Sequence, residues 1–201
     1  RIYAGQKAGG LGEDHQLSFE RFPAVALSKT YNTNQQTADS AGTMTAMITG
    51  VKTLAGVLSV DGSVRRGDCA SGQGAAVPSL LEEAEAAGLA TGVVSTARIT
   101  HATPGATYAH VVERDWEGGV PEEAAAQGCT DIAAQFLSFS HGDGIDVMLG
   151  GGRAMFLPNT VTDPEYPGKT GARRDGRNLI EAWRAANPDG AYLWHGDDLA
   201  A

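Results

Sequence analysis

Residues 36–50 read QTADSAGTMTAMITG and predict the start, body and end of one helix. Asp39 and Ser40 are residue types preferred at a helix N-cap, apolar residues follow at helical spacing, and Gly50 is a typical stop. The first turn of a helix leaves backbone N–H groups unpaired at the positive end of the helix dipole, so it can bind an anion such as phosphate. Two interpretations stay open: Asp39 or Ser40 is simply the N-cap, or Ser40 is a nucleophile placed beside a bound phosphoryl group.

Outward from this helix, apolar runs alternate with helical patterns. The runs are continuously apolar, which is typical of strands buried on both faces of a parallel sheet. We therefore predict an α/β fold with a mostly parallel central sheet, helices on both faces, and one domain over residues 1–201. Strands are predicted at residues 25–31, 89–95, 145–149 and 191–194, and helices after Ser40, at 78–87, from Thr103 toward Arg114, from Pro121 to Phe136 and around 179–186. Glycines 150–152 lack the spacing of a phosphate-binding loop and are interpreted as a tight strand exit.

The charge balance limits the partners. The 201 residues include 24 acidic and 15 basic side chains, a formal net charge of −9. Such a chain is poorly suited to bind nucleic acid or an anionic membrane. No run approaches the roughly 20 apolar residues that a membrane-spanning helix needs, so no span is predicted.

The chain contains two cysteines, Cys69 and Cys129. They are too far apart in the sequence for a CxxC redox motif or a zinc clip. A disulfide between them and a pair of unrelated buried thiols both remain possible interpretations of the residues alone.

Three blocks carry a wider resemblance: residues 39–53, DSAGTMTAMITGVKT; residues 86–116, AAGLATGVVSTARITHATPGATYAHVVERDW; and residues 145–156, IDVMLGGGRAMF. In order and spacing the chain resembles the alkaline phosphatase family, particularly the branch shared by animals and some marine bacteria. The resemblance extends over essentially the whole chain, including DPEYP at residues 163–167. It implies hydrolysis of phosphate monoesters at alkaline pH through a phosphoserine, assisted by two zinc ions and one magnesium ion.

The resemblance also implies a role for individual residues. Ser40 matches the nucleophile, which also ligates zinc, and Asp39 matches the acidic neighbour that orients a phosphate-binding arginine. That arginine is Arg114, whose planar guanidinium can donate two parallel hydrogen bonds to phosphate oxygens. Thr103 matches a magnesium ligand, and His101 lies where the family has Asp or His beside the magnesium site.

From the residues alone, each of these positions also has a structural interpretation. Arg114 could be a surface arginine near a helix C-terminus, and Thr103 could be an N-cap before Pro104. His101 could equally be structural, as we predict for His110. A tryptophan that follows the arginine, Trp116, either walls the site or packs in the core.

The family further implies a homodimer, a Cys69–Cys129 disulfide and therefore an oxidising compartment, periplasmic or extracellular. The family's remaining metal ligands have no counterpart in this sequence, because its first metal-binding Asp lies upstream of the serine and others lie further downstream. The chain is therefore expected to be the N-terminal part of a larger enzyme and to be inactive in isolation. The alternative is a non-catalytic phosphate-binding module.

Overall fold

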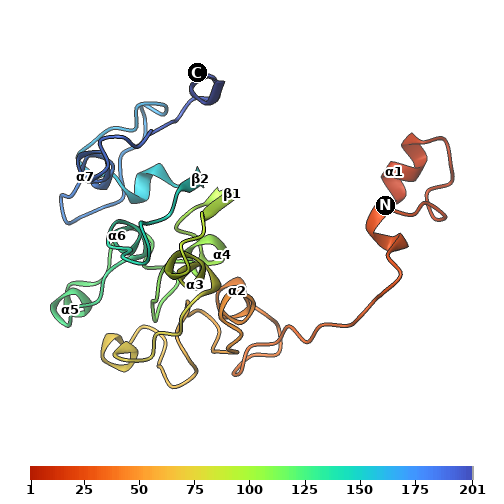
Figure 1. Ribbon diagram of the computed structural model, residues 1–201, viewed down its shortest axis with the longest axis horizontal. Coiled ribbons are helices and arrows are strands. Elements are labelled where there is room, and N and C mark those ends of the chain that lie inside the picture. The colour runs from red at the N-terminus through yellow and green to blue at the C-terminus, as the bar shows by residue number, and fades with distance from the viewer. Residues whose placement is uncertain (201) are drawn as a thin grey trace.

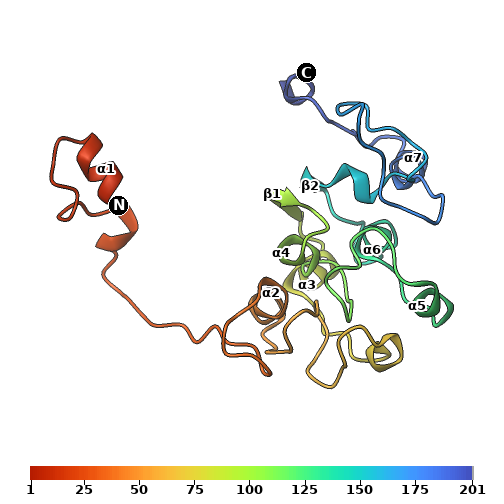
Figure 2. The same ribbon diagram turned by 180° about the vertical axis from the view of Figure 1, so that it is seen from behind.

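Two parallel strands lie among short helices in the structure, a computed structural model that describes residues 1–200 (Figures 1 and 2). The α-helices are α1 (Ile2–Lys7), α2 (Ser40–Thr49), α3 (Leu80–Ala86), α4 (Ala102–Gly105), α5 (Glu122–Ala126), α6 (Ile132–Leu137) and α7 (Leu179–Ala186). The strands are β1 (Gly92–Arg98) and β2 (Val147–Gly151), and 3₁₀ helices cover Ser18–Arg21, Cys69–Gly72, Arg153–Met155 and Gly196–Ala200. No helix within residues 1–200 is long and apolar enough to span a bilayer.

The sheet is parallel, as predicted. β1 pairs with β2 in the register Gly92↔Val147, Val93↔Met148 and Val94↔Leu149, and a register shift follows before Arg98. Parallel pairing requires a long crossover, and α4, α5 and α6 lie between the two strands in the sequence. The α/β class is thus confirmed, with a sheet of two strands in the part of the chain that the structure describes.

The strand predicted at residues 25–31 is not formed. This segment is extended and leads away from the body of the molecule toward α1 (Figure 1). Val25 and Leu27 are almost fully exposed, and Lys52 Nζ donates to the backbone oxygens of Lys29 and Tyr31. The residues have strand propensity, but a strand also needs a hydrogen-bonded neighbour, and none of residues 1–200 pairs with this segment as a ladder.

Two further predictions at the level of elements were wrong. The single helix predicted from Pro121 to Phe136 is two helices, α5 and α6, because Gly128 adopts φ +89° and ends the first. Asp131 then starts α6 as an N-cap, accepting a hydrogen bond from the Ala134 N–H (2.9 Å). No strand forms at residues 191–194, where the chain has no ladder partner among the described residues.

Buried side chains form three clusters. The first joins α2, α4 and α6 through Ala41, Ala102 and Ile132, with Leu58 and Tyr108 between them. Figures 1 and 2 both show α2 and α4 side by side, as this packing requires. The third cluster seats α7 through Leu179, which is fully buried near Phe156 and Ala133.

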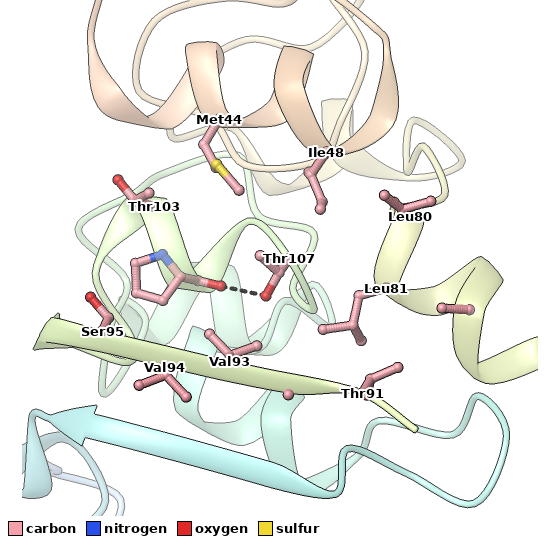
Figure 3. A pocket seen from close by; sticks show the side chains of 13 residues that line it. Met44, Ile48, Leu80, Leu81, Thr91, Val93, Val94, Ser95, Thr103 and Thr107 are labelled. Carbon is pink, nitrogen blue, oxygen red and sulfur yellow. Dashed lines mark hydrogen bonds between the residues drawn. The ribbon is translucent and has the colours of Figure 1, made fainter. Parts of the chain in front are cut away.

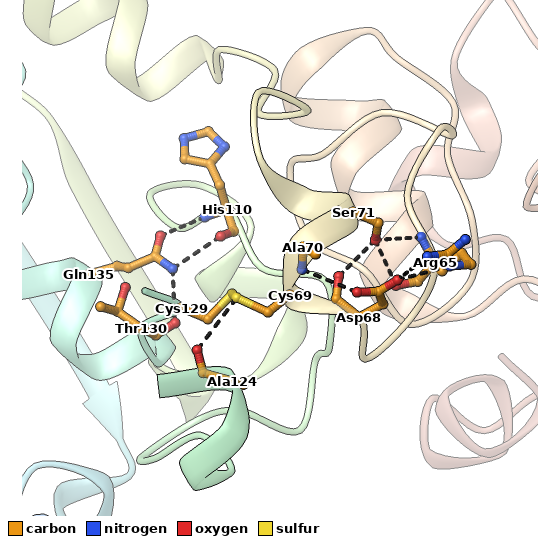
Figure 4. Close-up of a disulfide and its surroundings, with 10 residues drawn as sticks. All are labelled: Arg65, Asp68, Cys69, Ala70, Ser71, His110, Ala124, Cys129, Thr130 and Gln135. Carbon is orange, nitrogen blue, oxygen red and sulfur yellow. Dashed lines mark hydrogen bonds and ion pairs between the residues drawn. A yellow bond between two sulfur atoms is a disulfide. The ribbon is translucent and has the colours of Figure 1, made fainter. Parts of the chain in front are cut away.

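The second cluster surrounds a disulfide between Cys69 and Cys129 (Figure 4). Their Cα atoms are 5.9 Å apart, and 60 residues separate them in the sequence. Trp116 is buried in this cluster with Val112 and Ala124, so it is a packing residue in this structure. The bond fixes the loop after α5 against the 3₁₀ helix at residues 69–72.

A buried ion pair connects the loop before α7 to the start of α6. The Arg173 guanidinium is 1% exposed and donates to both carboxylate oxygens of Asp131, at 2.9 and 3.0 Å. Arg173 also contacts Asp175, a partly exposed carboxylate. Because Asp131 is also the N-cap of α6, one carboxylate serves both the helix start and the buried arginine.

Candidate functional site

The start of α2 resolves which residue caps the helix. Asp39 is the N-cap, and its Oδ1 accepts a hydrogen bond from the Gly42 N–H (3.0 Å). Ser40 is the first helical residue and is half-buried. Its hydroxyl has no hydrogen-bond partner among residues 1–200. The cap is therefore supplied by Asp39 alone, and the Ser40 hydroxyl remains available beside the unpaired first-turn N–H groups.

Segments on both sides hold Asp39. The Asn32 Oδ1 accepts a hydrogen bond from the Asp39 N–H (2.9 Å), and the Gly56 N–H donates to Asp39 Oδ2 (2.8 Å). Gly42 permits this close approach, since an added Cβ there would overlap the Asn32 side chain and the Leu54 backbone. The Asp39 carboxylate thus caps α2 with Oδ1 and accepts the Gly56 N–H with Oδ2.

Arg114 contacts that second oxygen. Its Nη1 donates to Asp39 Oδ2 at 3.3 Å, and its side chain is 21% exposed, so the guanidinium is partly screened yet accessible. The Arg114 N–H donates to the Gly56 backbone oxygen (2.8 Å). Asp39, Gly56 and Arg114 are thereby joined in one cycle of hydrogen bonds, although they are far apart in the sequence.

The helix predicted from Thr103 toward Arg114 was wrong. α4 covers four residues, and Arg114 lies in a turn in which the Trp116 N–H donates to the Glu113 backbone oxygen (3.2 Å). The chain leaves the helix because Val111 exchanges two backbone hydrogen bonds with Leu58 (2.9 and 3.0 Å). These long-range bonds outweigh the helical pattern of the apolar residues.

His101 also contacts the arginine. Its Nε2 lies 3.3 Å from Arg114 Nη2. A guanidinium can only donate, so Nε2 is the acceptor in this contact. His101 is at the N-cap position of α4 but makes no side-chain capping bond. Its side chain is directed to the site rather than to the helix.

Thr103 is not the predicted N-cap, because it lies inside α4. It is exposed, and its hydroxyl has no hydrogen-bond partner in the described part of the chain. With Met44 and Ile48 of α2, it lines an apolar pocket of about 410 Å³ that also borders α3 and β1 (Figure 3). The structure therefore leaves the Thr103 hydroxyl free beside the face where α2 meets α4.

The ligand sets that hold metal ions in proteins combine several groups. Residues 1–200 contain no group of three or more His, Cys, Asp or Glu side chains placed to hold a metal ion. The hydroxyl oxygens of Ser40 and Thr103 have no hydrogen-bond partner among the described residues, and a hydroxyl oxygen is a suitable ligand for magnesium.

Sequence reasoning missed two residues of the site, Asn32 and Gly56. Neither is signalled by its local pattern, because Asn32 lies in a turn and Gly56 in an apolar run. The Asn32 side chain accepts from the Asp39 N–H, and the Gly56 backbone bonds to the Asp39 carboxylate and to the Arg114 N–H. Only the folded arrangement shows that they set the position of Asp39 and Arg114.

His110 lies outside the site and is structural, in a buried polar cluster. Its Nε2 contacts Glu82 Oε1 and its Nδ1 contacts the Ser59 backbone oxygen, both at 2.7 Å. Because both ring nitrogens face acceptors, the arrangement fits the imidazolium. Burial opposes this charge, but the hydrogen bonds to Glu82 and Ser59 outweigh it, so the pKa of His110 is raised from its ordinary value of 6.5. His141 faces the same Glu82 oxygen at 3.3 Å.

This cluster predicts a loss of stability as pH rises above the ordinary histidine pKa. A raised pKa in the folded state stabilises the fold fully below the ordinary histidine pKa, and that contribution is lost as pH rises through the folded value. Between the ordinary pKa and the raised pKa of the folded state, we expect the free energy of unfolding of the wild type to fall relative to that of His110→Gln. Chemical denaturation of both full-length proteins at a series of pH values measures the difference, and parallel pH profiles would contradict the prediction.

Comparisons with known proteins agree with one another. The sequence profile of the family described as "Alkaline phosphatase" matches residues 1–201. The alkaline phosphatase of Gadus morhua is 47% identical over 206 residues, covering 99% of this chain and 43% of the relative. The tissue-nonspecific isozyme of Gallus gallus is 44% identical over 209 residues, covering 100% of this chain and 40% of the relative.

Solved structures give the same result. The alkaline phosphatase of the Antarctic bacterium TAB5 superposes with a TM-score of 0.62 at 26% identity, over 94% of this chain and 44% of that one. The alkaline phosphatase of Thermus thermophilus superposes with a TM-score of 0.63 at 28% identity, over 92% of this chain and 31% of that one. A variant of the TAB5 enzyme has Mg bound in one of its sites. The chain spans about two fifths of the length of the curated relatives it matches.

Proposed function

We propose a function from one established premise: this chain belongs to the alkaline phosphatase family. The proposed activity of the protein that carries it is the hydrolysis of phosphate monoesters at alkaline pH through a phosphoserine at Ser40. One observation supports this most directly. An unengaged serine hydroxyl occupies the first residue of α2, and the Asp39–Arg114 pair lies at the same helix end.

In this proposal Arg114 binds the phosphate. Its contacts with Asp39 and His101 use one hydrogen on each terminal nitrogen and leave further N–H groups to donate to phosphate oxygens. The first-turn N–H groups of α2 add donors on the side of Ser40. Asp39 fixes the guanidinium in position, so little conformational entropy is lost when the phosphate binds.

The proposed chemistry has two steps. The Ser40 oxygen forms a bond to phosphorus while the bond from phosphorus to the alcohol oxygen breaks, and the proton lost by the serine hydroxyl is balanced by the one that the departing oxygen gains as it leaves as the alcohol. Water then attacks the phosphoserine, which releases inorganic phosphate and restores the serine. Because the proposed binding groups, Arg114 and the first-turn N–H groups of α2, are assigned to the phosphate alone, broad acceptance of phosphate monoesters is expected.

Two zinc ions and one magnesium ion are proposed as cofactors. We assign Ser40 as a ligand of zinc and Thr103 as a ligand of magnesium, with His101 beside the magnesium site. The free hydroxyls fit these assignments, but they supply single ligands only, so the remaining ligands are assigned to parts of the parent protein outside this chain. When bound, zinc would lower the pKa of the Ser40 hydroxyl, which a serine needs in order to act as a nucleophile.

Family membership also supports a compartment and an assembly for the parent protein. We propose a periplasmic or extracellular location, because the Cys69–Cys129 disulfide persists only in an oxidising environment. The proposed assembly is a homodimer, by analogy with the family. Nucleic acid is not a proposed partner, since the chain carries a formal charge of −9.

Peptide mapping tests the proposal. The full-length protein is mixed with a phosphate monoester, quenched in acid and analysed by mass spectrometry, and its zinc and magnesium contents are measured in parallel. Phosphate on the peptide that contains Ser40, together with bound metal, is the expected result. Phosphate binding without any phosphopeptide or metal would instead establish the alternative, a non-catalytic phosphate-binding module.

A further inference from the structure

Arg66 packs directly against the site, although it contacts neither Ser40 nor Thr103. Its Nε and Nη2 donate to the two carboxylate oxygens of Glu113, at 2.8 and 2.7 Å. Its guanidinium also covers Gly56, where an added Cβ would lie 2.5 Å from Arg66 Cζ. The Arg66 side chain therefore binds Glu113, the residue before Arg114, and covers Gly56, whose backbone is hydrogen-bonded to both Arg114 and Asp39.

Gly56 is the junction of the site. It donates its N–H to Asp39 and accepts a hydrogen bond from the Arg114 N–H, both at 2.8 Å. It adopts φ +83°, a conformation that is strained for residues with a side chain. With no side chain, Gly56 leaves a space that the Arg66 side chain fills. If Arg66 moved, the Gly56 backbone would lose the contact on that side.

Glu113 shapes the turn that carries Arg114. Besides Arg66, its carboxylate accepts a hydrogen bond from the Asp115 N–H (3.1 Å), which closes the turn around Arg114. The backbone next to Arg66 supports the same segment, because the Gly67 N–H donates to the Val112 backbone oxygen (2.9 Å). Residues 66 and 67 thus hold the chain immediately before Arg114 by two independent contacts.

The charges alternate in a way that supports the arrangement. Asp39 pairs with Arg114, and Glu113 pairs with Arg66. Burial disfavours ionisation of Glu113, but the hydrogen bond from Arg66 and the nearby Arg114 outweigh it and lower its pKa. Glu113 therefore stays ionised and keeps both bonds to Arg66 at the pH of the proposed reaction.

We propose that Arg66 is a positioning residue for phosphate binding, holding Arg114 and Asp39 in place through Glu113 and Gly56. The inference rests on the proposed function, because it deepens the role of the same site. The Arg66 side chain is 46% exposed but its pair with Glu113 is bidentate, so thermal unfolding is measured beside phosphate binding to separate stability from positioning.

The test compares four variants of the full-length protein, assayed with zinc and magnesium present. Arg66→Ala removes the hydrogen bonds to Glu113 and the contact with Gly56. Arg66→Lys keeps the charge but cannot donate two parallel hydrogen bonds to Glu113. Glu113→Gln removes the partner's charge. Arg65→Ala is the matched control, since it removes the same charge from the adjacent residue, which is 80% exposed and pairs with Asp68 away from the site.

Inhibition by inorganic phosphate and the kinetics of an aryl phosphate are measured for each variant. A misplaced binding group lowers affinity, so we expect the inhibition constant and KM of Arg66→Ala to rise by about tenfold to a hundredfold, with a smaller change in kcat. Glu113→Gln should change them in the same direction, and Arg66→Lys should recover only part of the loss. Arg65→Ala should match the wild type.

Several results would overturn the inference. Equal inhibition constants for Arg66→Ala and Arg65→Ala would show that Arg66 does not position the site. Full recovery in Arg66→Lys would show that charge alone matters. Thermal unfolding checks folding, and if Arg66→Ala melts early, Glu113→Gln alone decides the outcome. A wild type with neither turnover nor phosphate inhibition would reject the proposed function itself, which is a distinct result.

Discussion

Ser40→Ala is expected to lower kcat for phosphate monoesters by at least about four orders of magnitude, the scale seen when an enzyme loses its nucleophile. The fold should be unaffected, because Asp39 supplies the helix cap and the Ser40 hydroxyl bonds to no other described residue. Alanine also has the highest helix propensity, so α2 should form at least as well. Activity and stability are therefore expected to separate completely in this variant.

Steady-state kinetics with an aryl phosphate and thermal unfolding of the full-length protein measure the two effects. Ser63→Ala is the control, since it removes an exposed serine hydroxyl that bonds only to Asp61. Asp39→Ala provides the contrast, because it should lower both stability and phosphate affinity by removing the cap and the partner of Arg114. Turnover in Ser40→Ala close to that of the control would reject Ser40 as the nucleophile.

Arg173→Met should destabilise the fold by about 3–5 kcal/mol, the cost of leaving a buried carboxylate without its partner. Arg173 is 1% exposed and donates two hydrogen bonds to Asp131, which is itself buried. Methionine fills much of the volume but neutralises no charge. The start of α6 should loosen first, because Asp131 is its N-cap.

A second substitution separates the charge from the cap. Asparagine at position 131 can still accept the Ala134 N–H but carries no charge. Adding Asp131→Asn to Arg173→Met should therefore restore part of the lost stability, measured as the free energy of unfolding by chemical denaturation. If the single and double variants are equally unstable, lost packing rather than the unpaired charge explains the effect.

The parts of the fold predicted correctly are those that leave a local pattern in the sequence, namely helix caps and continuous apolar runs. The N-caps of α2 and α7 are Asp39 and Asn178, whose side chains accept hydrogen bonds from first-turn N–H groups, and such caps are visible in the sequence. The parallel pairing of β1 with β2 follows from two apolar runs separated by helical segments.

The errors have long-range causes. Arg114 lies in a turn because Leu58 and Gly56, more than fifty residues earlier, bind the chain around it. Residues 25–31 have the composition of a strand, but a ladder depends on a neighbour that composition does not reveal. Gly128 could have been read as a helix stop, and the regular spacing of apolar residues across it was misleading.

The site shows the same division. Ser40, Asp39 and Arg114 are site candidates because their motif blocks resemble those of the family, and the structure brings Asp39 and Arg114 into contact. Asn32, Gly56 and Arg66 could not be selected in this way. Two of them act through backbone hydrogen bonds and the third through a carboxylate on another segment, so their roles exist only in three dimensions.

The cycle of hydrogen bonds through Asp39, Gly56 and Arg114 has a consequence for folding. Gly56 lies 17 residues and Arg114 lies 75 residues after Asp39, to which both are bonded. Local structure that forms early in folding therefore cannot assemble this cycle. Contacts of such sequence separation form only after much of the loop entropy has been lost. During refolding, the capacity to bind phosphate should therefore return late, together with the core, and should lag behind the recovery of helical signal.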